Sequence, residues 1–326
     1  MTDINLQIFS SCSFDPWFNL SLEEYFYNTI PDNTVILYLW QNENTIVIGK
    51  NQNPLAECNM NKVKEDGVFI ARRLSGGGAV FHDRGNLNFT FLAKKENFNV
   101  QLQLEVIKKA CELAGIKAEI SGRNDILVNE RKFSGNAFYH SKESSYHHGT
   151  LLIDSDINKI QNYLTPDISK LQAKGVKSVK SRVVNLKEIN SELTCDKMRD
   201  FLKTAAQEVY GLKVKMMEEP KAQETQRIAE LYGSEEYIYK TPIPYTAVFK
   251  KRLSLGNFEF RILVKEGKVI DLQVFTDALD HKISEKLKAS LMGVTYNIWD
   301  FEKALSKNFE RDFVKEIINM IKTSAE

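Results

Sequence analysis

The chain has 326 residues, 43% hydrophobic and 27% charged, and its 44 Lys and Arg almost balance its 43 Asp and Glu, for a net charge of +1. This composition is typical of a globular protein with two domains, and the balance disfavours a nucleic-acid binder that relies on bulk positive charge. Four scattered cysteines favour a reducing cytoplasm over a disulfide or zinc framework, and we expect neither a signal peptide nor a membrane span, since no leader pattern or long apolar run occurs.

The first fifty residues predict one helix and two strands. Asp15 and Pro16 suit an N-cap and a first helical position, and apolar residues follow at helical spacing. Residues 34–40 and 45–49 are strand-like and are separated by the polar segment 41–44. This pattern predicts an antiparallel hairpin.

The segment 72–86, Arg-Arg-Leu-Ser-Gly-Gly-Gly-Ala-Val-Phe-His-Asp-Arg-Gly-Asn, is the most informative part of the chain. It lies between the extended runs 67–71 and 88–92. Glycine has no side chain to hold a ligand away, so three glycines beside paired arginines suit close approach of the backbone to an anion. The alternative is a flexible connection with solvated arginines. The segment fits neither the Walker nor the dinucleotide-binding pattern.

A second polar segment follows a helix predicted over residues 101–114. Residues 126–128, a turn at 129–131 and residues 132–134 predict a hairpin. Because side chains alternate along a strand, we expect Lys132 and Ser134 to share one face. Small residues follow Lys132 and would let another molecule approach it, although a lysine exposed to water is the simpler alternative.

The remaining chain alternates between helical and extended patterns. Residues 146–152, with His147 and His148, predict a strand, and the lysine- and serine-rich stretch 166–181 predicts a loop. Pro242 and Pro244 mark a linker. We predict helices at 157–164, 195–210, 223–231, 283–291 and 301–321, and strands at 258–264 and 269–275. Strands and helices in separate runs indicate an α+β fold.

Taken together, the motifs resemble those of the lipoate–protein ligase A family, a branch of the biotin/lipoate ligase superfamily. The resemblance rests on six pieces in register and covers almost the whole chain. They are the segments at 15–20, 51–54, 72–86, 122–125 (Gly-Arg-Asn-Asp), 132–137 (Lys-Phe-Ser-Gly-Asn-Ala) and 147–152 (His-His-Gly-Thr-Leu-Leu). Residues 173–186 are also similar to the family segment that folds over the adenylate.

The resemblance implies both a fold and an activity. The fold is α+β, with a catalytic domain of mixed or antiparallel sheet over residues 1–244 and a small α+β accessory domain over 245–326. The activity is ATP-dependent ligation of lipoate to a lysine of lipoyl-domain proteins through lipoyl-AMP, with Mg²⁺, in a cytoplasmic salvage pathway. The implied acceptors are the glycine cleavage H protein and the E2 subunits of 2-oxoacid dehydrogenases, with no nucleic-acid or membrane partner.

The resemblance also implies site residues. Lys132 is the expected catalytic residue and contacts both the carboxylate of the acid and the α-phosphate of the nucleotide. The expected binding residues are Arg73, Ser75, Gly76, Gly77, Gly78, Ala79, Val80, Phe81, His82, Asn86, Asp125, Lys132, Ser134, Gly135, Ala137, His148 and Gly149.

Several of these assignments leave alternatives open. Asp125 would orient Lys132, bind a metal ion or only shape the hairpin, and no metal ligand is otherwise assigned. His82 suits a pocket wall or a structural role better than a general base. His147 and His148 point to opposite faces of a strand, so we expect His148 to line the acyl tunnel and His147 to be exposed. Phe81 and Phe138 are candidate tunnel walls.

Four rival functions are compatible with this scaffold. An ATP-independent octanoyl or lipoyl transferase on this scaffold would commonly use a cysteine thioester, but none of the four cysteines lies within a motif. A lysine-dependent transferase that takes the acyl group from another lipoyl-domain protein stays as the alternative. An inactive scaffold protein is disfavoured by the intact motifs, and a biotin ligase by its different glycine pattern.

Overall fold

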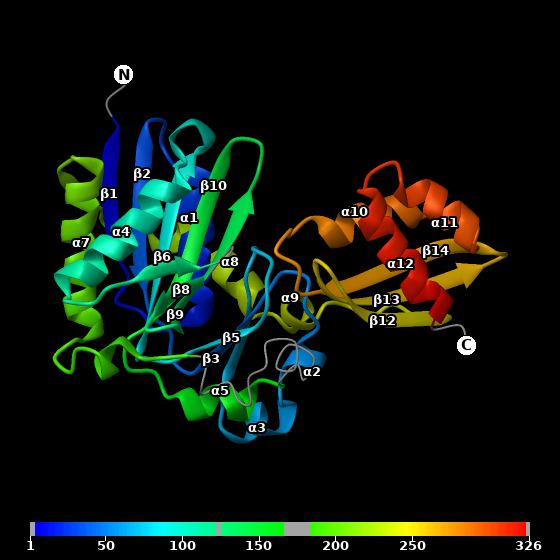
Figure 1. Cartoon of the computed structure of the whole chain (residues 1–326), viewed down its shortest axis with the longest axis horizontal. Helices are drawn as coiled ribbons and strands as arrows, with labels where there is room; N and C mark the ends of the chain where they lie inside the picture. Colours follow the sequence, from blue (N-terminus) through cyan, green and yellow to red (C-terminus); the bar gives the residue numbers. More distant parts are fainter. Residues whose placement is uncertain (1–3, 122–124, 166–182, 324–326) are drawn as a thin grey trace. The chain divides into compact units, whose positions relative to one another are not determined.

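The computed structural model describes residues 4–121, 125–165 and 183–323, which form two compact units (Figure 1). The large unit contains Met1–Val47, Glu57–Ala71 and Val80–Ile238. The small unit contains Ile48–Ala56, Arg72–Ala79 and Tyr239–Glu326. The small unit is therefore not a simple C-terminal domain, because two short segments from the first eighty residues belong to it.

An eight-stranded mixed sheet forms the centre of the large unit, in the order β11-β1-β2-β6-β10-β9-β8-β7. β1 is parallel to both β2 and β11, and the other pairs are antiparallel. The strands are β1 (Asn5–Ser10), β2 (Thr34–Trp40), β6 (Asn86–Lys94), β7 (Glu119–Ser121), β8 (Asp125–Val128), β9 (Arg131–His140), β10 (Ser144–Leu152) and β11 (Val214–Met216). The predicted α+β class with a mixed sheet is confirmed.

Helices cover both faces of this sheet (Figure 1). On one face, α4 (Val100–Leu113) and α7 (Cys195–Tyr210) join the main hydrophobic core with the inward-facing side chains of β2 and β6. On the other face, α1 (Pro16–Thr29) packs beside α8 (Ala222–Gly233). The predicted N-cap of α1 is confirmed, because the Asp15 carboxylate accepts hydrogen bonds from the Trp17 and Phe18 amides, both at 2.8 Å.

The predicted hairpin between residues 34–40 and 45–49 is wrong. β3 (Thr45–Ile48) belongs instead to a separate three-stranded sheet, in the order β4-β3-β5, with β4 (Phe69–Arg72) and β5 (Val80–His82). Both edges of β2 are already occupied, by β1 and by β6. No ladder position is left for β3, so the chain leaves the large sheet after Trp40.

Short helices complete the large unit and the segments that connect it to the small unit. They are α2 (Pro54–Glu57), α3 (Met60–Glu65), α5 (Ile157–Tyr163) and α9 (Glu235–Tyr239), with 3₁₀ turns at Lys95–Asn97 and Leu186–Glu188. The predicted helix over residues 157–164 is confirmed within one residue, and the helix predicted over 223–231 lies within α8.

The small unit has its own sheet and core. Its sheet runs β12-β13-β14, with β12 (Ala247–Leu253), β13 (Gly256–Lys265) and β14 (Lys268–Thr276), and α10 (Ile283–Leu291) packs on it. The single helix predicted over residues 301–321 is wrong, since two helices occur: α11 (Ile298–Leu305) and α12 (Arg311–Thr323). A straight helix of that length would extend about 30 Å. The break lets Phe301 and Ile317 join one compact core.

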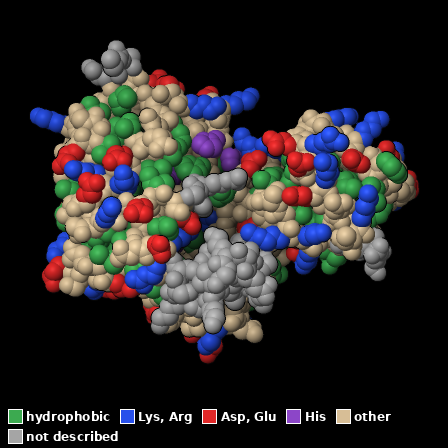
Figure 2. Space-filling model, viewed as in Figure 1, with side chains coloured by type: hydrophobic (Ala, Val, Ile, Leu, Met, Phe, Trp, Pro, Cys, Tyr) green, Lys and Arg blue, Asp and Glu red, His purple; other side chains and the backbone are tan. Residues whose placement is uncertain are grey.

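The described residues contain no helix that is long and apolar enough to cross a membrane. Figure 2 shows acidic and basic side chains interspersed over the visible face of each unit, which agrees with the near-zero net charge.

Candidate active site

Lys132 lies at the start of β9 in the large unit, one residue after a tight turn. Asn129 and Glu130 form this turn with positive φ angles of 48° and 61°, which suit a two-residue hairpin turn. The Lys132 ammonium is 2.7 Å from the Asp125 carboxylate, and both side chains are partly exposed, at 33% and 24%. An ammonium has three donors, so two N–H groups of Lys132 are left after the contact with Asp125, as far as the described residues are concerned.

Gly135 leaves the space that the lysine occupies. A Cβ atom at Gly135 would lie 2.9 Å from the Lys132 Nζ atom. The register of the hairpin shifts between Ile126 and Leu127, so that Phe133 is an extra residue between the paired positions of Lys132 and Ser134. Asp125, Lys132 and Gly135 thus share one face.

Ser134 is on the other side of the hairpin, contrary to the alternation predicted for Lys132 and Ser134. It pairs with the core residue Ile126, is 1% exposed, and its hydroxyl has no hydrogen-bond partner among the described atoms. The prediction failed because the register shift lets Phe133 and Ser134 both enter the core. The Gly135 amide donates to the Thr150 hydroxyl of the neighbouring strand at 3.2 Å.

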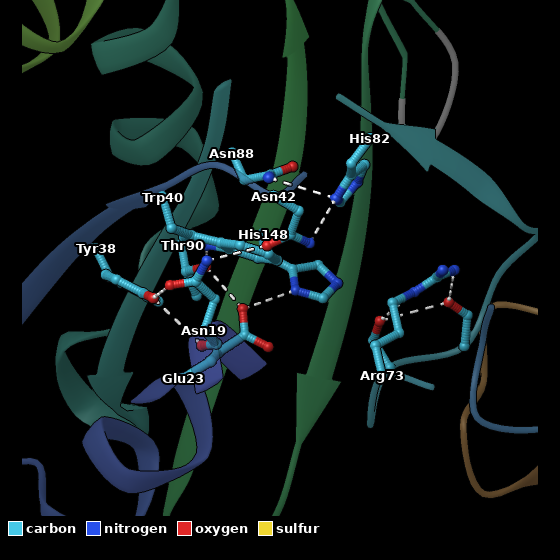
Figure 3. A network of polar contacts seen from close by, with 12 residues as sticks. Asn19, Glu23, Tyr38, Trp40, Asn42, Arg73, His82, Asn88, Thr90 and His148 are labelled. Atoms are coloured by element: carbon cyan, nitrogen blue, oxygen red, sulfur yellow. Dashed lines mark hydrogen bonds and ion pairs between the residues drawn. The ribbon is translucent and has the colours of Figure 1, made fainter. Parts of the chain in front are cut away.

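A buried polar network lies on the α1-facing side of the large sheet (Figure 3). Glu23, on α1, is 3% exposed and accepts a hydrogen bond from the Thr90 hydroxyl at 2.7 Å. The same carboxylate oxygen is 2.9 Å from the His148 Nδ1 atom. The Trp40 indole donates to Thr90 at 3.1 Å. Sequence reasoning missed Glu23, whose only signal was an acidic side chain among the apolar positions of an amphipathic helix.

His82 lies at the end of this network. Its Nδ1 atom is 3.2 Å from the Asn42 amide nitrogen and 3.4 Å from that of Asn88 (Figure 3). Two side-chain amide nitrogens point at Nδ1, which places this nitrogen to accept from them and fixes the orientation of the ring. The Asn86 side-chain amide donates to the Asn88 side-chain oxygen at 2.9 Å. His82 is 3% exposed, and this fixed orientation supports the predicted wall or structural role.

His147 is on the core side of the same strand as His148. It is fully buried between Gln103, 3.1 Å from its Nδ1, and Asn136, 2.9 Å from its Nε2. The prediction that His147 is exposed is wrong, because α4 covers this side of the strand and supplies Gln103. Burial lowers the pKa of His147 to about 3, and the nearby His148 adds to this effect. The half-buried Phe138 ring stacks on His147 with centroids 4.7 Å apart, so it lies on the face of the sheet opposite to His148 and not among the predicted tunnel walls.

Gly149 is another core position of the predicted set. A Cβ atom there would lie 2.6 Å from the Phe89 ring and 2.7 Å from the Asn136 side-chain oxygen. Ala137, in contrast, pairs with His148 and is 8% exposed. Phe81 is buried against the Tyr163 ring, with centroids 5.3 Å apart, and Val80 is half-buried on β5.

The glycine-rich loop belongs to the small unit up to Ala79, and Arg73 fixes its shape. The Arg73 Nη2 atom donates to the Gly76 and Gly78 carbonyl oxygens, both at 2.8 Å, and its Nε atom donates to the Ser75 hydroxyl at 3.0 Å. Arg73 is 6% exposed. The Arg73 guanidinium therefore stabilises the curved conformation of the loop, in addition to any part that it takes in binding an anion.

Gly76 and Gly77 of this loop, and Gly49 beside it, have steric reasons to be glycine. Gly77 has a φ of +93°, which disfavours other residues. A Cβ atom at Gly76 would lie 2.5 Å from the Ala278 carbonyl oxygen, and one at Gly49 would lie 2.2 Å from that of Gly77. The Gly77 amide donates to Ala278 at 3.0 Å. The loop is thus packed backbone against backbone within the small unit.

Arg72 fixes the segment 49–52, which is hydrogen-bonded to this loop through the Lys50 amide and the Ser75 carbonyl oxygen, and sequence reasoning missed this structural role. Arg72 is 1% exposed, and its Nη1 atom donates to the carbonyl oxygens of Gly49, Lys50 and Gln52 at 3.2, 2.9 and 2.8 Å. The predicted site residues thus form two groups. One lies around Lys132 and His148 in the large unit, and the other is the loop from Arg73 to Ala79 in the small unit.

No group of three or more His, Cys, Asp or Glu side chains in the described part of the chain could hold a metal ion. The predicted loop over residues 166–181 and the segment Gly122–Asn124 lie outside the described residues.

Comparison with known families shows to which class of protein this chain belongs. A model of the lipoyl protein ligase A/B catalytic domain matches residues 15–207, and a model of the bacterial lipoate protein ligase C-terminus matches residues 243–323. The first match alone covers more than half of the chain. The fold and the site therefore define a lipoyl protein ligase.

Individual relatives identify the family within this class. The lipoate-protein ligase A of Bdellovibrio bacteriovorus is 40% identical over 300 residues, which is 89% of this chain and 88% of that protein. That of Psychrobacter cryohalolentis is 37% identical over 92% of this chain and 91% of its own. P. falciparum LipL1, solved in complex with lipoate, is 31% identical with a TM-score of 0.86 and covers 97% of this chain and 99% of its own. The chain belongs to the lipoate–protein ligase A family and is a ligase.

Proposed function

We propose that this chain uses ATP to activate lipoate as lipoyl-AMP and then transfers the lipoyl group to a lysine of a lipoyl-domain protein. The observation that carries the proposal is the partly exposed Lys132 ammonium, held by Asp125 over Gly135 with two donors left. In a chain of this ligase family, such a group has the reach and the charge that carboxylate activation requires.

The first half-reaction brings two anions together. A carboxylate oxygen of lipoate attacks the α-phosphorus of ATP, and the bond from that phosphorus to the bridging oxygen breaks, releasing pyrophosphate. Repulsion between carboxylate and phosphate opposes the approach, and a preorganised cation offsets it. A lysine suits this role because its ammonium is a compact charge that serves two oxygens in different directions. Asp125 orients Lys132 in this scheme.

The donor set around Lys132 fits a magnesium ion that arrives with the nucleotide. Asp125 is a single carboxylate there, and the described residues hold no three-ligand cluster. Mg²⁺ commonly binds through one or two carboxylates, substrate phosphates and water. Asp125 would hold it, and the ion would neutralise part of the phosphate charge.

In the second half-reaction, the enzyme mainly has to position the acceptor lysine against the acyl carbon of lipoyl-AMP. The neutral amine of the acceptor lysine attacks the acyl carbon of the mixed anhydride, and AMP leaves with the electron pair. The loop Arg73–Ala79 with Val80 and Phe81 is our proposed holder of the adenylate. The face with His82, Asn86, Ala137 and His148 is our proposed surround of the acyl chain, and Ser134 and Gly149 support it from the core side.

The other assignments are also proposals. We assign catalysis to residues 1–244 with 245–326 as an accessory domain, although residues 48–56 and 72–79 pack with the latter. We propose the cytoplasm as location, lipoate salvage as role, and the glycine cleavage H protein and 2-oxoacid dehydrogenase E2 subunits as acceptors. A structure of an archaeal two-part ligase together with its E2 lipoyl domain has the same fold, with a TM-score of 0.63 at 22% identity.

A cysteine-dependent transferase receives no support from the thiols. Cys58 and Cys111 are buried, and burial raises the pKa of Cys111 to about 12. Burial also raises the pKa of Cys195 to about 12, and its thiol donates to the Arg84 carbonyl oxygen at 3.5 Å. A raised pKa lowers the thiolate fraction that a thioester mechanism needs.

The decisive experiment separates the two half-reactions. The protein is incubated with lipoate, ATP and Mg²⁺, and pyrophosphate release is measured with and without a lipoyl domain. We expect a burst of pyrophosphate without the acceptor and continuous turnover with it. Lipoylation that proceeds equally well without ATP, from an acylated donor protein, would replace this proposal by the transferase alternative.

A further inference from the structure

The ladder between the neighbouring strands β9 and β10 ends near the candidate active site. Its last described pair joins Asn136 to Gly149. If the same register continued, Lys132 would lie opposite Ile153. Residues 183–188, named here the wedge segment, bond to both of these residues instead.

The backbone of the wedge segment joins the two strands. The Val184 amide donates to the Lys132 carbonyl oxygen at 3.0 Å, beside a parallel bridge between Lys132 and Val183. The Lys187 amide donates to the carbonyl oxygen of Ile153, the residue that follows β10, also at 3.0 Å. The wedge segment therefore holds the start of β9 to the end of β10, beyond the point where their described ladder ends.

Asn185 fastens the wedge segment to the chain that follows β10. Its Oδ1 atom accepts a hydrogen bond from the Ser155 amide at 2.9 Å, and its Nδ2 atom donates to the Ser155 carbonyl oxygen at 2.8 Å. On either side of it, Val184 and Leu186 are fully buried in the main core. Both polar atoms of the Asn185 side chain bond to the same backbone residue, so this side chain is suited to hold the segment in place.

Glu188 connects the wedge segment to the residue before Lys132. Its Oε1 atom accepts from the Asn185 amide at 3.1 Å, and its Oε2 atom is 3.1 Å from the Arg131 Nη1 atom. The Glu188 side chain is 44% exposed, so this ion pair contributes little to stability. With the bond between Val184 and Lys132, it completes a closed ring of contacts around the start of β9.

We propose that Asn185 is a positioning residue for adenylation, which acts by fixing Lys132 relative to β10. The proposal rests on the role of Lys132 proposed above. The Lys132 ammonium must meet a carboxylate whose acyl chain we assign to the face with His148, on β10. Their distance depends on how β9 and β10 are held together, and at Lys132 the wedge segment holds them. A displacement of about 1 Å at a reacting group can lower a rate by about a hundredfold.

The test compares N185A with N190A as a matched control. Asn190 is also half-buried and also makes two hydrogen bonds to backbone, donating to the Ala114 carbonyl oxygen at 2.9 Å and accepting from the Glu192 amide at 3.1 Å. We expect both variants to lower the melting temperature by about 2–4 °C. Only N185A should lower the kcat of adenylation, measured as pyrophosphate release, by about tenfold or more, with the KM for ATP and for lipoate within about twofold of wild type.

Two further variants separate positioning of Lys132 from a general structural role. In a K132M background, N185A should change the residual adenylation rate by less than about twofold, because it acts through the lysine. E188A alters an exposed side chain and should fold, with kcat lowered by about threefold. A kcat of N185A equal to that of N190A would overturn the proposal, and so would a full additional loss when N185A is added to K132M. If N185A does not fold, a wild-type kcat in E188A would overturn it.

Failure of the proposed function has a different signature. Wild type would then form no lipoyl-AMP, whereas hydrogen exchange at the Val184 amide would still report on the wedge segment. We expect this amide to exchange about tenfold faster in N185A than in wild type and in N190A, because the segment loses its attachment to Ser155. Equal exchange in the three proteins would show that Asn185 does not hold Lys132, and would overturn the proposal.

Discussion

Two histidines that are neighbours in sequence illustrate how one strand serves two purposes. His148 faces α1 and pairs with Glu23, in the network that we assign to the acyl chain. His147 faces α4, is fully buried between two amide side chains, and has its pKa lowered to about 3. The α1 face and the α4 face of β9 and β10 therefore differ in what a mutation should affect. Changes on the first should alter activity, and changes on the second should alter stability.

The largest expected effect is on the α1 face. K132M should lower the rate of lipoyl-AMP formation by about 10²–10³ or more, because it removes a preorganised charge from the place where two anions meet. The fold should be unaffected, since the Lys132 side chain is one-third exposed. Pyrophosphate release and circular dichroism measure the two outcomes, with K142M, at an exposed lysine, as the control. A folded K132M enzyme with near-normal adenylation would exclude this role.

The next effect comes from two glycines on opposite faces of the strands. G149A places a methyl group against the Phe89 ring and Asn136, and overpacking of this kind costs about 1–3 kcal/mol of unfolding free energy. G135A meets only the flexible end of Lys132. We expect G149A to lower the melting temperature and G135A to lower adenylation with little change in stability. The reverse pattern would show that the assignment of the faces is incorrect.

His147 should make the stability of the large unit sensitive to acid. Its pKa is about 3 in the folded chain against about 6.5 when unfolded, so the unfolded state binds the extra proton first. The stability from neutral His147 is complete above pH 6.5 and declines, by at most about 1.4 kcal/mol per pH unit, as the pH falls toward 3. Denaturant unfolding of wild type and H147Q between pH 7 and 4 measures it. If the free energy of unfolding depends on pH in the same way in wild type and in H147Q, the effect does not come from His147.

The smallest expected effect concerns cysteines, since neither β9 nor β10 contains one. Replacing Cys12 and Cys195 with alanine should leave acyl transfer within a few-fold of wild type. Mass spectrometry during turnover should find the lipoyl group on the acceptor and none on the enzyme. A hydroxylamine-sensitive acyl adduct on either thiol would move the mechanism to thioester transfer.

Local patterns predicted many elements of this fold correctly. The N-cap at Asp15, the hairpin before Lys132, and the helices Cys195–Tyr210 and Ile283–Leu291 follow from capping, turn and periodicity signals that are local in sequence. The strand β1 was missed because it is short and pairs with β2, which lies beyond α1. The strand β12 forms a hairpin with the next strand, β13, and was missed because its sequence contains the charged run 250–252.

The errors have a common cause in tertiary context. The hairpin between β2 and β3 failed because β1 and β6 occupy both edges of β2, which no local pattern reveals. The face of Ser134 was wrong because one extra residue shifts the register, and the exposure of His147 was wrong because α4 covers it. Glu23 escaped notice because a single charged residue acquires meaning only from its neighbours in space.

The small unit is built from early and late segments of the chain, and this determines what happens when the chain is cut into two fragments. Gly76 and Gly77 of the glycine-rich loop contact Ala278, which follows them by about two hundred residues. A polypeptide that stops near Pro242 would lack the surface against which this loop is packed. Supplying the remaining residues as a second polypeptide should restore it. A break at this point would therefore make ligation depend on the meeting of two fragments, which is the requirement for a reporter of protein association.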